Sequence, residues 1–430
     1  MTVHRRRTGA ARFVLLLSCV FFVSSLATAQ TTVYMLEFMR PEESAWQRRV
    51  IDLFHERQDQ IRVEIVSVAG TNAIQKMRVM LVAGEPLDIG YYDPHVVNNW
   101  GSEGIARDLT PYVERDKAVF EEFFPPAMDL FNVRGRQYGI PIDLQAMATF
   151  YSQKAFDEAG LAYPHPDWTW DDFAALGRRL SVDRDGDGVI DRWAVRFPEW
   201  MHWMPMIWAF DADFVDRVKE PTAFTGDTLE MQRALEFMVD LIHGQKVMAP
   251  PGVITGRTAD NIVRTEVIAM GLGNTIYMQH AIPAEQATGV PWNVTRLPIG
   301  PTGNRPSLLN AIGLLIFETS QVPTAAWEVI KFFSSRDAME LAVSMRGTMV
   351  PHRGVTVESW MNAYTSPKDR HFFIEAIAEG RGIPNLVDDG LSAVRTQIDR
   401  IGQGQVTIPE GLEAMRTGVE NWLRQQPWVN

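Results

Sequence analysis

The sequence predicts an α/β fold in which helices cover a parallel sheet. Two observations lead to this prediction. Apolar strands alternate with amphipathic helices over residues 33–91, and helices dominate after residue 323. About 400 residues follow the N-terminal leader described below, which is enough chain for two domains.

The first half of this pattern is regular. Residues 33–36 form an expected strand, and residues 44–58 form a helix whose apolar side chains recur at helical spacing. Residues 61–66 alternate as a strand. A second helix covers 73–83, and a short apolar strand covers 87–91. Because ligands of parallel sheets bind beyond the carboxyl ends of the strands, the loops after the first and third strands form the expected site.

Later in the chain, proline and glycine cluster over residues 283–306. The strongly apolar segment 308–317 follows and is expected to be a buried strand. Helices are then expected over 323–345, 368–380 and 409–426. These helices should pack onto lobes built earlier in the chain.

The first 29 residues have the pattern of an export signal. The apolar run 13–23 is too short for a typical membrane span, and Ala27-Thr28-Ala29 supplies the small residues that a signal peptidase needs. The mature protein is therefore expected to begin near Gln30 and to work in the periplasm. The basic residues before the apolar run are Arg5, Arg6, Arg7 and Arg12.

The leader has three alternative interpretations. Leu16–Cys19 loosely resembles a lipoprotein cleavage box, but lipid attachment there would leave the apolar segment 20–23 directly after the lipid, which argues against it. Thr8-Gly9-Ala10 fits a twin-arginine export motif poorly. An uncleaved signal anchor needs only a failed cleavage.

The composition is that of an ordinary exported globular chain, with 46% hydrophobic and 22% charged residues. The formal net charge is -12, and the leader holds four of the arginines and no acidic residue. A chain this acidic is a poor partner for nucleic acid or anionic lipid.

The only cysteine, Cys19, lies in the leader, so the mature chain needs neither disulfides nor thiol chemistry. A monomer is expected.

Familiar catalytic motifs are absent from the sequence. There is no Gly-x-Ser-x-Gly elbow, no Gly-Lys-Ser/Thr phosphate loop and no His-Glu-x-x-His pair. Gly271-Leu272-Gly273 lacks the third glycine of a dinucleotide fingerprint. A pair of glycosidase carboxylates stays open, because its two acids need only be close in space.

An acidic, glycine-rich segment occupies residues 183–191. Counted from its first residue, carboxylates fall at positions 1, 3, 5 and 9 and Gly188 at position 6, as in the first part of an EF-hand calcium loop. Position 12 is Ala194, where a bidentate Glu normally binds calcium. An equally weighted alternative is a turn whose Asp side chains cap backbone N–H groups. No cofactor is required, and a structural calcium would be held by Asp183, Asp185, Asp187 and Asp191.

Aromatic residues are dense over 193–210, together with Glu199 and His202. Aromatic faces stack on the C–H faces of sugar rings, while carboxylates accept hydroxyl hydrogen bonds, so this composition suits a site for neutral polar ligands. The alternative is a core helix, because positions 200, 203 and 207 would lie on one helical face. For the segment as a whole, at least one exposed aromatic is expected.

A series of short motifs runs through nearly the whole mature chain in a specific order: Gly84–Ile89, Gly104–Tyr112, Tyr138–Pro141, Tyr151–Lys154, Trp168–Phe173, the loop 183–191, Ala325–Phe333 and Gly347–Pro351. In this order and spacing they resemble extracellular solute-binding proteins of ABC importers, of the sugar-binding class that includes maltodextrin-binding protein. The resemblance implies a two-lobed periplasmic binding protein fold with crossover hinge strands, whose lobes close on ligand like a clamshell.

The resemblance also implies domain limits. The N-terminal lobe is expected to comprise residues 30–142 and 311–352, and the C-terminal lobe residues 143–310 and 353–430. Crossovers are expected near 142–145, 308–313 and 351–354. The ligand residues that the resemblance implies, on loops facing the cleft, are Glu37, Tyr92, Asp93, Gln145, Glu199, Trp200, Trp203, Tyr277, Asn310 and Arg353.

Two departures from the family pattern leave the identity of the sugar open. Tyr151-Ser152 replaces the usual Tyr-Asn pair, and Tyr277 stands where the family often has a stacking Trp.

The leading prediction is a receptor without catalysis that binds a sugar or oligosaccharide and delivers it to ABC permease subunits. The alternatives are a secreted carbohydrate-active enzyme, such as a glycosidase or lyase, and a receptor for a phosphorylated polyol or a polyamine. Basic residues in the cleft would favour phosphate, and extra carboxylates would favour a polyamine.

Overall fold

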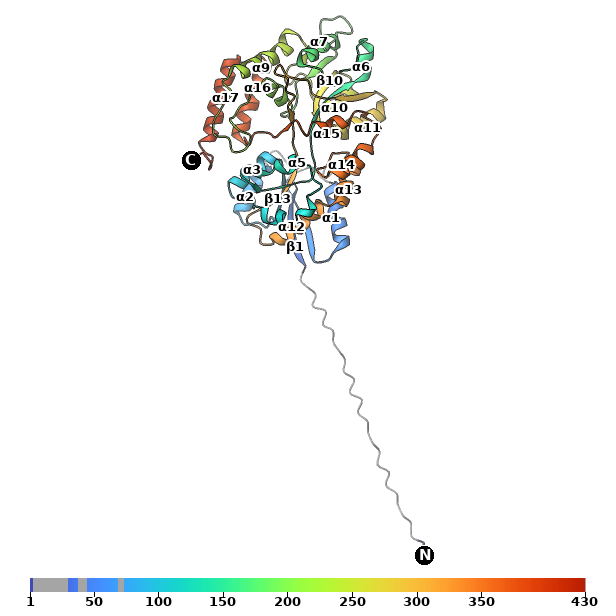
Figure 1. Ribbon diagram of the computed structural model, residues 1–430, viewed down its shortest axis with the longest axis vertical. Helices are drawn as coiled ribbons and strands as arrows, with labels where there is room; N and C mark the ends of the chain where they lie inside the picture. The colour runs from blue at the N-terminus through green and yellow to red at the C-terminus, as the bar shows by residue number, and fades with distance from the viewer. Residues whose placement is uncertain (3–29, 38–44, 69–72, 430) are drawn as a thin grey trace.

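The computed structural model describes residues 1–2, 30–37, 45–68 and 73–429, and the chain folds into two lobes, each built on a five-stranded sheet (Figure 1). The features of the expected export signal, which span residues 5–29, lie outside these residues. Within the described part of the chain, no helix combines the length and apolar character needed to cross a membrane.

The sheet of the first lobe has the strand order β2-β1-β3-β13-β6. Strand β1 runs parallel to β2 and β3, as the sequence predicts, whereas β13 is antiparallel to both β3 and β6. A mainly parallel sheet of this kind needs helices on its faces. The strands are β1 Thr31–Glu37, β2 Ile61–Ser67, β3 Ile89–Tyr92, β6 Ile140–Pro141 and β13 Gly313–Ile316.

Helices with one apolar face cover this sheet. On α1, Trp46 and Val50 are buried, and the Trp46 ring meets Phe333 of α12 edge-on with ring centroids 6.0 Å apart. Ser335 caps the N-terminus of α13 by accepting a hydrogen bond from the backbone of Ala338. The elements are α1 Ala45–Arg57, α2 Ala73–Val82, α3 Pro94–Ser102, α4 Thr110–Arg115, α5 Pro125–Asp129, α12 Pro323–Phe333, α13 Arg336–Arg346 and the hairpin β4 Asn132–Val133 with β5 Arg136–Gln137.

The sheet of the second lobe has the strand order β11-β7-β10-β8-β9. Strand β7 is antiparallel to β10 and β11, and β8 is parallel to β10 and β9. The rings of Phe150 on β7 and Trp292 on the neighbouring strand β11 are stacked, with centroids 5.5 Å apart, and this contact links the two strands in the core. The strands are β7 Met147–Ser152, β8 Trp193–Arg196, β9 Met248–Ala249, β10 Ile268–Asn274 and β11 Trp292–Thr295.

Two helices of the second lobe begin at capping boxes. Thr169 and Asp172 form a capping box on α7, and Thr407 and Glu410 form one on α17. Helices α16 and α17 pack on each other and on α9, at the outer edge of the lobe (Figure 1). The helices are α6 Gln153–Glu158, α7 Trp170–Leu180, α8 Met204–Trp208, α9 Leu229–Val239, α10 Thr258–Val263, α11 Met278–Thr288, α15 His371–Glu375, α16 Asp389–Gly402 and α17 Ile408–Leu423.

The chain passes between the lobes close to the expected crossovers. Gln145 and Asn310 form an antiparallel bridge, with backbone N–H···O distances of 2.8 and 2.9 Å, and Leu144 N–H donates to Met349 at 2.9 Å. The strands of the two sheets fall on the expected sides of these crossovers, while the exact domain limits stay predictions. Helix α14 (Arg353–Glu358) packs on α13, so the chain after residue 353 begins against the first lobe.

Several expected elements are shorter or divided. The single strand expected over 308–317 is two short strands, because residues 309–312 between them form a crossover: β12 Ser307–Leu308 pairs with β14 Gly380–Arg381, and β13 joins the first-lobe sheet. The helix expected over 323–345 divides at Ser334, which lies between α12 and α13. Only residues 371–375 of the helix expected over 368–380 are α-helical.

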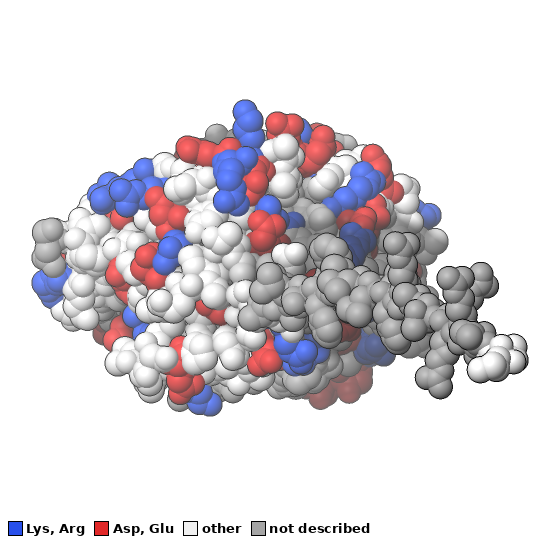
Figure 2. Space-filling model, turned by 90° about the horizontal axis from the view of Figure 1, so that it is seen from below, with Lys and Arg blue, Asp and Glu red and all other residues white. Residues whose placement is uncertain are grey.

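Acidic and basic side chains are interspersed on the face shown in Figure 2. Among the described residues of that face, no continuous basic patch is visible, in keeping with the net charge of -12. Nothing on this face suggests the single-sign field of a nucleic-acid-binding surface.

Candidate functional site

A cavity of about 570 Å³ lies between the two lobes, a size typical of small-ligand sites. Its first wall comes from α2, the end of β3 and α3, and its second wall from the loop before α8 and from α16 with the residues leading into it. The described lining residues are Ile74, Gln75, Arg78, Tyr92, Asp93, His95, Val96 and Trp100 of the first lobe, and Trp200, Met201, Val387, Asp388, Leu391, Ser392, Arg395, Thr396 and Asp399 of the second.

Tyr92 and Asp93 place polar atoms on the first wall. They stand at the carboxyl end of β3, where the alternation of strands and helices predicts a site. The Tyr92 ring packs edge-on against Trp100 with centroids 4.8 Å apart. Asp93 Oδ1 accepts a hydrogen bond of 2.7 Å from Asn310 Nδ2, and burial raises the pKa of Asp93 to about 6 against the opposing effect of this bond. The wall therefore presents a positioned carboxyl beside aromatic rings.

Trp200 is the aromatic side chain of the second wall. Its φ of 53° is in the left-handed region, which bulky residues rarely adopt and which is found most often at functional sites. The indole N–H of Trp203 donates to the Trp200 carbonyl at 3.0 Å and helps to hold this conformation. Asp388, on the same wall, is also left-handed with φ 49°. Two of the strained residues of the chain thus line one cavity.

Trp203 lies elsewhere. It is 1% exposed and packs edge-on against Phe214 with ring centroids 5.6 Å apart, inside the core of the second lobe. The helical spacing that put positions 200 and 203 on one face does not apply, because α8 begins only at Met204. In this conformation Trp203 supports the backbone of Trp200 and has no access to the cavity.

Glu199, Tyr277 and His202 form a hydrogen-bonded cluster close to Trp200, although none of the three lines the cavity. The Tyr277 hydroxyl donates to Glu199, which also accepts from Thr258 Oγ1 at 3.2 Å, and His202 Nδ1 lies 3.0 Å from the same hydroxyl. Burial lowers the pKa of His202 to about 4 and raises that of Tyr277. His202 is therefore neutral near pH 7, and its Nε2 has no partner among the described residues.

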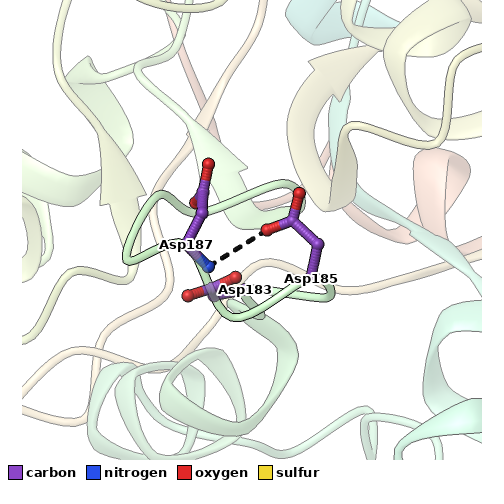
Figure 3. Close-up of side chains that lie close together, drawn as sticks. All are labelled: Asp183, Asp185 and Asp187. Carbon is purple, nitrogen blue, oxygen red and sulfur yellow. Dashed lines mark hydrogen bonds between the residues drawn. The ribbon is translucent and has the colours of Figure 1, made fainter.

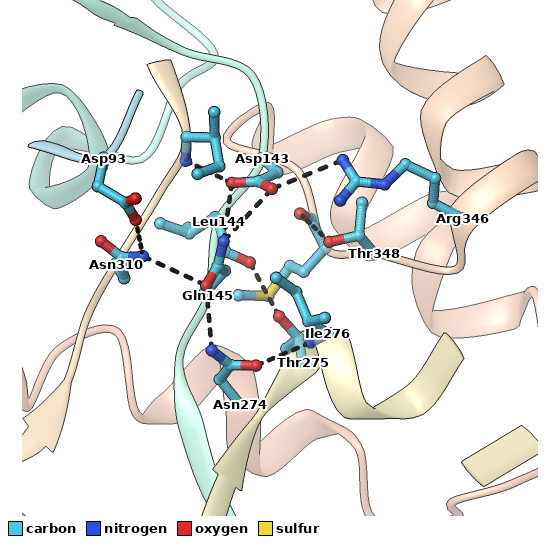
Figure 4. Close-up of polar contacts among 12 residues, drawn as sticks. Asp93, Asp143, Leu144, Gln145, Asn274, Thr275, Ile276, Asn310, Arg346 and Thr348 are labelled. Carbon is cyan, nitrogen blue, oxygen red and sulfur yellow. Dashed lines mark hydrogen bonds and ion pairs between the residues drawn. The ribbon is translucent and has the colours of Figure 1, made fainter. Parts of the chain in front are cut away.

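Gln145 and Asn310, both expected to bind ligand, are buried in the hinge (Figure 4). Gln145 Oε1 accepts from Asn274 Nδ2 at 3.0 Å and from Asn310 Nδ2 at 3.4 Å. Because Asn310 also bonds Asp93, a continuous polar chain runs from the first wall of the cavity through the hinge to β10 of the second lobe. These amides connect the cavity to the pivot of the two lobes.

A buried ion pair supports the same hinge. Asp143 is fully buried and lies 3.6 Å from Arg346 on α13, while its Oδ1 accepts from the backbone N–H of Ile312 at 2.6 Å. Burial raises the pKa of Asp143 to about 6, and Arg346 opposes the shift. Two crossovers and a helix of the first lobe are thereby joined at one carboxylate (Figure 4).

Two other expected ligand residues lie away from the described cavity walls. Glu37, at the end of β1, is buried and paired with Arg48 at 2.6 Å. Arg353, at the start of α14, donates to the Glu121 carbonyl at 2.9 Å. Ligand contacts of these residues stay predictions, and residues 38–44, which follow Glu37, lie outside the described part of the chain.

Comparison with known proteins identifies the family. Residues 40–340 match the family model described as bacterial extracellular solute-binding protein. The chain belongs to this family. A binding protein of Brucella abortus is 23% identical over 319 residues, 72% of this chain and 73% of that protein. A mannitol-binding protein of Pseudomonas aeruginosa is 28% identical over 178 residues, 41% of this chain and 38% of that protein.

Solved structures of solute-binding proteins share the fold of this family member. A substrate-binding protein of Listeria monocytogenes, solved in complex with cycloalternan, matches with a TM-score of 0.78 and 20% identity over 92% of this chain and 99% of that chain. The sugar-binding protein MalE of Xanthomonas citri matches with a TM-score of 0.76 and 18% identity over 93% and 99%. The two-lobed architecture expected from the sequence is thus confirmed.

The sequence did not point to the side chains that this solute-binding protein contributes from α16. Arg395 and Asp399 lie one helical turn apart and both line the cavity. Burial raises the pKa of Asp399, and Arg395 opposes the shift. The amphipathic pattern after Asp388 could have revealed the helix. Its position across the cavity from α2, about 300 residues away in sequence, left no local signal.

The acidic loop 183–191 is exposed and does not line the cavity (Figure 3). Asp183 accepts from the backbone of Gly186 and Gly188 at 2.7 and 2.8 Å, which lowers its pKa. Asp191 accepts from Arg184 N–H at 2.5 Å. Oxygens of Asp183, Asp185 and Asp187 lie within 4.8 Å of one another, and Asp191 is not part of this group. The side chains cap the turn, and calcium binding stays a prediction.

Proposed function

We propose that this protein is an exported receptor that captures a sugar or oligosaccharide between its lobes and delivers it to the membrane subunits of an ABC importer. The observation that carries the proposal is the cavity between the lobes, which combines Trp200 and Tyr92 with the carboxyl of Asp93. Aromatic faces suit the apolar faces of sugar rings, and carboxylates accept the hydroxyl hydrogen bonds. The names of the related proteins, which include a mannitol-binding and a sugar-binding protein, support this ligand class.

The mixed charge of the cavity favours a neutral ligand over the alternatives. The first wall holds Arg78 and Asp93, the second holds Arg395, Asp388 and Asp399, and Arg78 is already paired with Glu103 at 3.0 Å. A phosphorylated polyol would need basic groups in excess, and a polyamine would need an excess of unpaired carboxylates. Basic groups are not in excess, and burial raises the pKa of both Asp93 and Asp399, which reduces the negative charge available to a polyamine.

The test is a thermal-shift screen of the chain from Gln30 against maltose, maltotriose, mannitol, glucose 6-phosphate and spermidine, followed by calorimetry of each hit. A ligand at a hundred times its dissociation constant should raise the free energy of unfolding by about 2.7 kcal/mol. We expect hits among the neutral sugars or polyols only. Stabilisation by the phosphate or by spermidine alone would contradict the proposed ligand class.

Receptor function also implies binding without turnover. The bound sugar should be recovered intact after prolonged incubation with the protein, as measured by chromatography of the supernatant. Hydrolysis at or above one turnover per protein, abolished by Asp93→Asn or Asp399→Asn, would favour the carbohydrate-active enzyme instead.

A further inference from the structure

A second group of contacts joins the lobes outside the ligand cavity and the hinge. It comprises Ser102, Asp129 and Arg134 of the first lobe with Lys219 and Glu220 of the second, and we call it the interlobe latch. Lys219 and Glu220 belong to the loop between α8 and α9, which the bridge between Val215 and Phe224 closes at its base. None of these five residues lines the cavity between the lobes.

Both oxygens of the Glu220 carboxylate are bound by the first lobe. Ser102 Oγ, at the end of α3, donates to Oε1 at 2.9 Å, and Arg134 Nε pairs with Oε2 at 2.5 Å. The Glu220 side chain is only 10% exposed. Next to it, Lys219 Nζ reaches the Asp129 carboxylate at 2.9 Å and the Asp129 carbonyl at 2.6 Å. Two consecutive residues therefore make four polar contacts with the opposite lobe.

The backbone on both sides of the latch is strained. Glu220 has a φ of 47°, and Arg134, at the tip of the β4–β5 hairpin, has a φ of 52°. Non-glycine residues persist in this region only where their surroundings impose it. The positive φ of Arg134 belongs to the two-residue β4–β5 turn, in which Gly135 also has a positive φ, whereas the Glu220 conformation coincides with its contacts to the first lobe.

The latch is also connected to the second wall of the cavity. The Val218 carbonyl accepts a hydrogen bond of 2.7 Å from the backbone N–H of Asn385, in the segment that leads to Val387, Asp388 and α16. On its other side, the Pro221 carbonyl accepts from the indole N–H of Trp428 at 2.9 Å. The loop is thus anchored to the helical part of the second lobe that faces the ligand space.

We infer that Lys219 and Glu220 are positioning residues for ligand capture, which hold the lobes in the closed arrangement by a hydrogen bond from α3 and by ionic contacts with α5 and the β4–β5 hairpin. Part of the free energy of closure then comes from the protein itself, and breaking the latch should favour the open form before any ligand is bound. Only the consequence for ligand affinity rests on the proposed receptor function.

The lobe separation can be measured without ligand. The chain from Gln30 has no cysteine. One spin label in each lobe can therefore be attached at Val82→Cys on α2, where Val82 is 90% exposed, and at Glu413→Cys on α17, where the Glu413 side chain is 72% exposed. Pulsed electron–electron distance measurement on the otherwise unchanged chain should show a dominant short distance. Glu220→Gln should shift the dominant population to a longer distance. The charge-swapped pair Glu220→Arg with Arg134→Glu should restore the short one.

Glu158→Gln is the matched control, because Glu158 on α6 pairs with Arg192 at 2.7 Å entirely within the second lobe. It should leave the distance distribution unchanged. The unfolding midpoints of all variants should stay close together, which separates lobe opening from a loss of folding. A distribution in Glu220→Gln that matches the unsubstituted protein, or an unsubstituted protein that is already open, would overturn the inference. Neither result depends on whether the ligand is a sugar.

Discussion

The two walls of the cavity are built in different ways. On the first wall, Tyr92 ends the buried strand β3, Asp93 follows it, and Asn310 binds the Asp93 carboxyl from the hinge. On the second wall, Trp200 lies in a loop and has a left-handed φ, and α16 belongs to a segment near the C-terminus. The first wall is a product of regular sheet geometry. The second depends on tertiary packing that imposes strain, and substitutions should therefore act differently on the two.

The substitution with the largest expected effect on stability lies in the core behind the second wall. Trp203→Ala empties a fully buried site against Phe214 and removes the hydrogen bond to the Trp200 carbonyl. It should lower the free energy of unfolding by roughly 3–5 kcal/mol, as measured by chemical denaturation. A loss below 1 kcal/mol would mean that Trp203 is not a core residue in solution. The second wall would then not depend on the packing of this side chain.

Trp200→Ala tests the surface of the same wall. The side chain faces the cavity, so its removal should leave the unfolding free energy nearly unchanged and weaken sugar binding by about 1–3 kcal/mol. Calorimetry with the sugar that gives the largest thermal shift measures the affinity, and Trp203→Ala is the matched comparison. Unchanged affinity in Trp200→Ala would move the stacking platform to Tyr92 on the first wall.

Asp93→Asn tests the first wall through the pH dependence of the free energy of unfolding. The pKa of Asp93 in the folded protein is about 6, above the ordinary 3.8, so the folded state binds this proton more tightly than the unfolded state. The contribution of Asp93 protonation to the free energy of unfolding is complete below pH 3.8 and is lost as pH rises through about 6. Between pH 4 and 7 the protein should lose on the order of 2 kcal/mol of stability through this group.

Asp93→Asn should remove that part of the pH dependence and leave the part due to Asp143, which burial shifts in the same direction. Denaturation curves at pH 4 and pH 7 give the comparison. An identical pH dependence in the variant and the unsubstituted protein would show that Asp93 ionises normally and is better hydrated than its position on the wall implies.

The smallest effect is expected at the loop 183–191, which belongs to neither wall. Its carboxylates already cap backbone N–H groups, and a twelfth-position ligand is missing. Calcium chelation should change the unfolding midpoint slightly and leave sugar affinity unchanged. Loss of sugar binding on chelation, restored by calcium alone, would show that the loop acts on the cleft.

The sequence predicted the first wall because its signals are local. Strand and helix periods place β1 to β3 within about three residues of their observed limits, and a strand end marks Tyr92 and Asp93 directly. The second wall could be predicted only in part. Aromatic density around Trp200 was visible, but the direction of each ring depends on where α8 begins and on the left-handed turn before it. The approach of α16 to α2 depends on contacts between distant segments, which no periodicity encodes.

A cavity with one wall on each lobe has a kinetic consequence. A ligand that touches both walls can leave only when the lobes separate, so the lifetime of the complex is governed by the opening rate, whereas arrival depends on the open population. Changes on either wall should therefore alter residence time more than association rate. A membrane partner that pulls the lobes apart could release even a tightly held cargo, without having to compete for any atom of it.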